Sequence, residues 1–208
     1  MMSEKFLAYL LTIFLILFFS VHLFMDVRTK GKSILARNGA RGKDIGSRYT
    51  ILGITGSTFA FWVVFLATPF LIHFGVYEKI SSLLTLPLFK TCLSQAIGSS
   101  LMLLGVIIAD WGRVSRGYMA PSTFDVPEDF TFTRHGAYAV VRHPMYLSYY
   151  FMFAGLFLLT ANSILIFCIL GYPSYYLMAR REEEFLEERF SEYEGYRLKV
   201  GMFFPKLF

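Results

Sequence analysis

Residues 6–25 form an almost continuous apolar segment, and this segment most constrains what the chain can fold into. A helix needs about 20 mostly apolar residues to cross a bilayer, and the segment has that length. We do not expect a cleaved signal peptide, because the segment is too long and its basic neighbours follow it rather than precede it. The segment therefore predicts a membrane-spanning helix.

Four further apolar segments predict further spans. Only three residues, 161–163, separate the last two, so these two are expected to form a tight antiparallel hairpin. Both are short for a full span, which suggests that their open ends lie near the membrane interface. The four segments are residues 51–73, residues 96–109 with an extension back toward Phe89, residues 145–160 and residues 164–179.

The composition agrees with a membrane protein. Hydrophobic residues make up 55% of the 208 residues and charged residues 17%, and the mean hydropathy is +0.51. A soluble core of this size could not bury so much apolar surface. We therefore expect an all-α integral membrane protein with about five transmembrane helices, in a single membrane domain over residues 1–208. Residues 1–110 would hold three N-terminal spans, and residues 111–208 the hairpin and a C-terminal segment.

Basic residues predict the orientation of these spans. All but three of the 20 lysines and arginines lie between spans one and two, between spans three and four, or after span five. The other side of the layout holds Lys5, Lys79 and Lys90. Because basic residues accumulate on the cytoplasmic side, the N-terminus is expected outside and the C-terminus in the cytoplasm.

Two cysteines, Cys92 and Cys168, both lie in apolar stretches and form no motif. We expect neither a disulfide framework nor a metal site from them. The net charge of +5 would suggest anionic partners in a soluble protein, but here its distribution reflects orientation in the membrane. We therefore expect no nucleic acid, no metal and no obligatory protein partner.

Polar residues gather at the cytoplasmic ends of the hairpin. Arg142 and His143 stand directly before its first arm, and Glu182 and Glu183 follow its second arm, so the four are expected to be neighbours. Pro144 favours the first turn of a helix and pushes the preceding residue out of helical conformation, which predicts a helix start at or near Pro144. The free N–H groups of that turn beside an arginine form an anion site. With glutamates opposite, such a pocket suits a zwitterionic, ribose-bearing ligand.

Each of these residues also has an interpretation without a chemical function. Arg142 and Arg180 could be flanking residues whose side chains reach the lipid headgroups. The glutamates could form the solvated face of a helix, paired with neighbouring arginines. His143 could be a helix cap, and the tyrosines of the hairpin an aromatic belt at the interface. Composition and spacing alone leave both interpretations open.

A larger set of residues resembles a known family. It is similar to the isoprenylcysteine carboxyl methyltransferase and phospholipid methyltransferase superfamily of integral membrane enzymes, over about residues 131–205. The combination of Arg-His-Pro-x-Tyr with a later Glu-Glu is its specific part, whereas the N-terminal spans match only in hydropathy. The set consists of Gly136-Ala-Tyr138, Arg142-His143-Pro144-Met-Tyr146, Asn162, Glu182-Glu183-x-x-Leu186, Phe190, Tyr193, Tyr196, Val200 and Pro205.

The resemblance implies S-adenosylmethionine (SAM) as cofactor, bound at the cytoplasmic side in a pocket that the C-terminal segment closes. Residues 111–208 would then be the catalytic and cofactor-binding part, with Arg142 and Glu183 near the reacting centre. The family's arginine before the Glu pair falls on Met178, so Arg180 or Arg181 would take its place, or the alignment shifts by two. The resemblance assigns to the cofactor Phe130, Thr131, Phe132, Thr133, Tyr138, His143, Tyr146 and Glu182.

We therefore expect a SAM-dependent methyltransferase that acts on a lipid-tailed or apolar acceptor at the membrane interface. Carboxyl O-methylation of an isoprenylcysteine-like substrate is the first expectation, because an arginine fork such as that of Arg142 suits a carboxylate, which needs no general base. One alternative is phospholipid N-methylation, in which His143 or a glutamate takes the proton of the amine. Others are S- or O-methylation of a small apolar compound and, from a different class, a non-enzymatic transporter. The first, second, fourth and fifth spans carry no ionisable residue at mid-span, which disfavours the transporter.

Overall fold

The computed structural model describes residues 2–28, 47–117 and 132–206, and the regular structure of these residues is helical. Within them, β pairing is limited to two isolated bridges, Thr85 with Asn162 and Val141 with Gly201. The all-α class is therefore confirmed. The long helices are α1 (Glu4–Arg28), α2 (Arg48–His73), α4 (Cys92–Arg116), α6 (Pro144–Thr160) and α7 (Gly171–Arg189). The short elements are α3 (Tyr77–Leu84), η2 (Pro87–Phe89), α5 (Ala137–Val140), η3 (Ser163–Leu170) and α8 (Tyr193–Lys199).

Four helices of the described residues are long and apolar enough to cross a membrane, and they make the chain an integral multi-pass membrane protein. They are α1, α2, α4 and the continuous helix Ser163–Arg189, which joins η3 to α7. The fourth predicted segment, residues 145–160, corresponds to α6, an apolar helix of 17 residues that is shorter than the other four.

Local sequence explains where several of these helices begin. Ser47 precedes α2 and its hydroxyl accepts a hydrogen bond from the Thr50 amide, and Thr91 caps α4 in the same way through Ser94. At the hairpin, Ala161 ends α6 in the left-handed conformation with a φ of 52°, and the Asn162 side chain accepts from the Ile164 amide to start η3. The predicted tight turn is therefore formed, with two residues, Ala161 and Asn162, between α6 and η3 instead of the expected three.

The closest helix contact joins α4 and α6, which run antiparallel. A Cβ atom on Gly98 would lie 2.6 Å from the amide nitrogen of Leu159, and one on Gly155 would lie 2.6 Å from that of Met102. Glycine at both positions therefore lets the two backbones touch, which is a common way for helices to associate in a bilayer. The contact fixes α6 on α4, and with it the polar residues at the start of α6.

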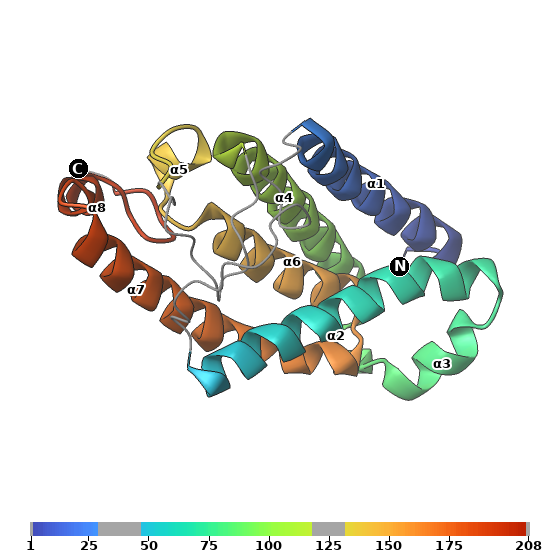
Figure 1. Cartoon of the computed structure of the whole chain (residues 1–208). Helices are drawn as coiled ribbons and strands as arrows, with labels where there is room; N and C mark the ends of the chain where they lie inside the picture. The colour runs from blue at the N-terminus through green and yellow to red at the C-terminus, as the bar shows by residue number, and fades with distance from the viewer. Residues whose placement is uncertain (1, 29–46, 118–131, 207–208) are drawn as a thin grey trace.

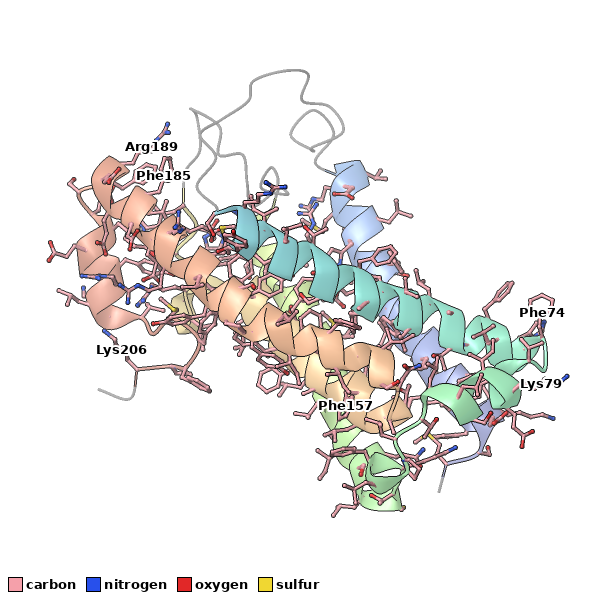
Figure 2. The ribbon with its side chains drawn as sticks, turned by 90° about the horizontal axis from the view of Figure 1, so that it is seen from below. Phe74, Lys79, Phe157, Phe185, Arg189 and Lys206 are labelled. Carbon is pink, nitrogen blue, oxygen red and sulfur yellow. The ribbon has the colours of Figure 1, made fainter. Side chains whose placement is uncertain are left out.

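The remaining helices place those polar residues at one end of the molecule. α2 packs antiparallel on the helix Ser163–Arg189, where Gly53 faces Ser174 and Ser57 faces Gly171. α5, α8 and the C-terminal residues lie at one end of the bundle and α3 lies at the other (Figure 1). The side-chain view agrees, with Arg189 and Lys206 at one end and Lys79 at the other (Figure 2).

Candidate active site

The segment that leads into α6 is anchored on the C-terminal end of α4. Gly136 has a positive φ of 59°, and a Cβ atom there would lie 2.2 Å from the Ser115 hydroxyl. The same hydroxyl accepts a hydrogen bond of 2.9 Å from the Ala137 amide. α5 follows, and α6 begins at Pro144 with His143 as its N-cap residue. The predicted helix start at Pro144 is confirmed.

A buried ion pair joins the two ends of the hairpin. Arg142 donates from Nε to Oε1 of Glu183 at 2.7 Å and from Nη2 to Oε2 at 3.0 Å. Arg142 is 9% exposed and Glu183 5%. The two-point geometry fixes the plane of the guanidinium relative to the carboxylate. The prediction that these two segments are neighbours in space is therefore confirmed.

His143 lies between the two glutamates. Its Nε2 donates to Oε1 of Glu183 at 3.0 Å, and its Nδ1 lies 3.5 Å from Oε2 of Glu182. Burial opposes a charge on the imidazole, but the hydrogen bonds to Glu182 and Glu183 outweigh it, so the pKa of His143 is raised above its ordinary value. The ring of Tyr146 lies parallel to that of His143, with centroids 5.5 Å apart, and its hydroxyl donates to Glu182.

The end of the described chain returns to this cluster as a strap (residues 200–206). The amides of Arg142 and His143 donate to the carbonyls of Gly201 and Met202, at 2.8 and 3.1 Å. Nη1 of Arg142 also donates to the carbonyls of Arg197, at 3.1 Å, and Val200. The family resemblance implied that the C-terminal segment closes the cofactor pocket. It did not identify these contacts, because a sequence motif does not show which backbone carbonyls accept hydrogen bonds.

Aromatic side chains hold the strip before α5 against α8. The ring of Phe132 lies 5.2 Å from those of Phe190 and Tyr193 and 5.7 Å from that of Tyr196. The Tyr196 hydroxyl donates to the Tyr138 carbonyl at 2.6 Å. Burial raises the pKa values of Tyr193 and Tyr196 above their ordinary values, so both hydroxyls stay neutral.

Not every predicted site residue joins the cluster. Phe130 and Thr131 lie outside the described residues, and Thr133 is half-buried beside Phe132. Arg180 is exposed on α7, and among the described residues no hydrogen bond or ion pair links it to Arg142, His143 or either glutamate. Met178, where the family's arginine would fall, is fully buried. The assignment of Arg180 to catalysis stays a prediction.

The groups present fit SAM by their chemistry. Glu182 is 24% exposed at its side chain and offers a carboxylate to an ammonium or to ribose hydroxyls. The first turn of α6 offers backbone N–H groups to a carboxylate, and tyrosines surround the cluster. In the described ranges, no group of three or more His, Cys, Asp or Glu side chains could hold a metal ion.

Comparison with known proteins agrees with this arrangement. The family model for phospholipid methyltransferase matches residues 93–193. A search of curated proteins finds no match to the chain. The family match excludes the non-enzymatic transporter. Over residues 93–193, which include Arg142, His143 and Glu183, the chain matches the phospholipid methyltransferase family, and the protein is an S-adenosylmethionine-dependent methyltransferase of the membrane.

Proposed function

We propose that this enzyme methylates the amino group of a phospholipid headgroup at the cytoplasmic face of the membrane. The observation that carries the proposal is the engagement of Arg142. All three nitrogens of its guanidinium contact Glu183 or backbone carbonyls of residues 197 and 200. An arginine whose three guanidinium nitrogens already have partners cannot hold a substrate carboxylate in two-point geometry.

The charge balance of the cluster supports an amine acceptor. Arg142 offsets Glu183, which leaves Glu182 as the partly exposed carboxylate beside the ring of Tyr146. A carboxylate and aromatic rings attract an ammonium group and repel a carboxylate. The carboxyl O-methylation of an isoprenylcysteine-like acceptor, which the sequence favoured, would require another cation such as Arg180, which lies exposed.

His143 supplies the proton acceptor that an amine requires. Bound at this cluster, SAM would supply an electrophilic methyl group on a sulfonium. The acceptor must offer the nitrogen lone pair, so its ammonium group first loses a proton. The neutral imidazole of His143 can take that proton, and Glu182 and Glu183 at its two ring nitrogens stabilise the imidazolium that results. The proton then passes from the imidazole to the partly exposed carboxylate of Glu182 and from there to water.

The membrane helices support a lipid acceptor. An apolar groove of about 280 Å³ runs between α2 and η3, with Gly56, Phe59 and Phe167 among its lining residues. It offers a surface for a lipid tail within the spanning part of the molecule, while the headgroup and the cofactor meet at the polar end. With the basic residues in the cytoplasm, that end and the C-terminus face the cytoplasm and the N-terminus faces outward.

A transfer assay with methyl-labelled SAM tests this proposal. Purified enzyme is incubated with vesicles of phosphatidylethanolamine, with vesicles of phosphatidylcholine, and with farnesylcysteine in detergent, and each product is treated with mild base. We expect base-stable label in phosphatidylethanolamine and none in phosphatidylcholine, whose nitrogen is already fully methylated.

Two other results would overturn the amine assignment. Label in farnesylcysteine that mild base releases as methanol would assign carboxyl O-methylation and a free cation at the acceptor site. SAM binding without transfer to any of the three acceptors would assign the enzyme to S- or O-methylation of a small apolar compound.

A further inference from the structure

The strap places one aromatic side chain against the imidazole of His143. We propose that Phe203 is a positioning residue, which keeps this imidazole dry and fixes its orientation between Glu182 and Glu183. Phe203 belongs to no motif in the sequence, and it acts through His143 rather than on a substrate. The inference about proton transfer rests on the proposed function, whereas the inference about the environment of His143 does not.

The strap is held to the start of α6 independently of Phe203. The amides of Arg142 and His143 donate to the carbonyls of Gly201 and Met202, and the Arg142 side chain donates to the Val200 carbonyl. At the far end, Nζ of Lys206 donates to the carbonyls of Arg197 and Leu198, at 3.0 and 2.9 Å. These contacts fix the backbone on both sides of position 203.

A tight turn then directs Phe203 inward and Phe204 outward. A Cβ atom on Gly201 would lie 1.7 Å from the carbonyl oxygen of Phe204, so the turn requires glycine at position 201. Phe203 is 9% exposed, whereas Phe204 is 77% exposed. Two adjacent residues of the same type therefore differ in their contacts, and they form a matched pair for an experiment.

Phe203 packs on both His143 and α6. Its ring centroid lies 6.0 Å from that of His143 and 5.2 Å from that of Tyr150. Tyr146 lies parallel to the imidazole, with ring centroids 5.5 Å apart. Two aromatic rings thus contact the imidazole, while the glutamates of α7 occupy its two nitrogens.

Several charged and titratable groups surround this imidazole. Glu182 and Glu183 face it from α7, Arg142 precedes it in the chain, and Tyr146 and Tyr150 lie on α6. Tyr193 and Tyr196 on α8 lie close enough to Glu183 and Arg142 to interact with their charges. Phe203 adds no charge to this group. Its effect is to exclude water, which strengthens the interaction of the imidazole with both carboxylates.

Loss of the Phe203 ring would let water reach the imidazole. Water both relieves the cost of burial and screens the two carboxylates, so the pKa of His143 would move from its raised position toward its ordinary value. The imidazole would also gain rotational freedom, and a proton acceptor displaced by about 1 Å can lose on the order of a hundredfold in rate.

The test compares Phe203→Ala, the conservative Phe203→Leu and the control Phe204→Ala. The protein has four histidines, so NMR titration of labelled enzyme, with His143→Asn to assign the signal, follows the imidazole directly. We expect the titration of His143 to shift to lower pH in Phe203→Ala, to shift less in Phe203→Leu, and to stay as in the wild type in Phe204→Ala. The pH profile of kcat should move in the same direction, with kcat reduced by at least about tenfold and KM for SAM little changed.

The possible results separate the two proposals. An unchanged His143 titration in both Phe203 variants, or an equal shift in Phe204→Ala, would overturn the role of Phe203. If Phe203→Ala does not fold, the titration of His143 in Phe203→Leu alone tests the role of Phe203. A shifted titration in an enzyme that transfers no methyl group to any amine would retain the role of Phe203 and overturn the proposed function.

Discussion

Arg142 and Glu183 hold each other through two parallel hydrogen bonds, from Nε to Oε1 at 2.7 Å and from Nη2 to Oε2 at 3.0 Å. The pair joins the start of α6 to α7, and the third guanidinium nitrogen joins both to the strap. Removal of one partner would leave an uncompensated charge in a buried position, which is strongly destabilising. Arg142 therefore organises the whole polar end of the molecule.

Arg142→Met is expected to lower the free energy of unfolding by about 3–5 kcal/mol, because the Glu183 carboxylate would remain buried without its partner. The double variant Arg142→Met/Glu183→Met should recover part of this loss. Thermal unfolding in detergent measures both effects. Arg180→Met is the matched control on the exposed side, with an expected change within about 0.5 kcal/mol. A stable Arg142→Met enzyme with only a raised KM for its acceptor would instead indicate that Arg142 binds substrate.

The raised pKa of His143 predicts how stability depends on pH. A histidine whose pKa is raised in the folded state binds its proton more tightly there than in the unfolded state, so it stabilises the fold below its ordinary pKa of about 6.5. That contribution is lost as the pH rises through the raised value. The unfolding midpoint of the wild type should therefore fall over this range relative to that of His143→Asn. His73→Asn, an exposed change at the end of α2, is the control; parallel curves for wild type and His143→Asn would contradict the prediction.

Hydropathy predicted the long helices because every helix that crosses a bilayer needs about 20 mostly apolar residues. Residues 6–25 and 51–73 lie within α1 and α2, and the turn at Asn162 separates α6 from η3 as expected. The short length expected for residues 145–160 is found in α6, but hydropathy could not show that α4 begins at Cys92 or that α7 ends at Arg189. These boundaries depend on caps and on packing against neighbouring helices.

The sequence could predict which polar residues meet, but not how they pair. The short hairpin brings Arg142 and His143 beside Glu182 and Glu183, and this follows from chain connectivity alone. The identity of the Arg142 partners does not, because its contacts with the carbonyls of Val200 and Gly201 depend on the path of the strap. In the same way, Arg113 and Asp26 are far apart in the sequence, and only the packing of α1 on α4 joins them.

The contact between α4 and α6 makes a third prediction about stability. Gly155→Ala is expected to cost about 1–3 kcal/mol, because the new Cβ atom would lie 2.6 Å from the Met102 amide nitrogen and the backbones would have to separate. Gly56→Ala is the control, since a Cβ atom there meets nothing within 4 Å and alanine favours the helix by about 0.5–1 kcal/mol. The thermal unfolding midpoint is expected to fall in Gly155→Ala and to rise in Gly56→Ala. Equal shifts in the two variants would rule out a backbone contact at Gly155.

The last prediction concerns the ion pair between α1 and α4. Nη2 of Arg113 donates to Oδ1 of Asp26 at 2.6 Å, and the Arg113 side chain is 3% exposed against 34% for that of Asp26. Within the described residues, Nε and Nη1 of Arg113 are buried without a hydrogen-bond partner, so Asp26 is the group that compensates this cation.

Asp26→Asn is therefore expected to destabilise the protein by about 1–3 kcal/mol, a value below that of a fully buried pair because water reaches the Asp26 carboxylate. Asp26→Leu/Arg113→Leu removes both charges and should be more stable than Asp26→Leu alone, because no buried cation is left without a partner. Thermal unfolding of these variants and of Arg113→Leu alone measures the coupling. Additive effects in the double variant would mean that water, rather than Asp26, compensates Arg113.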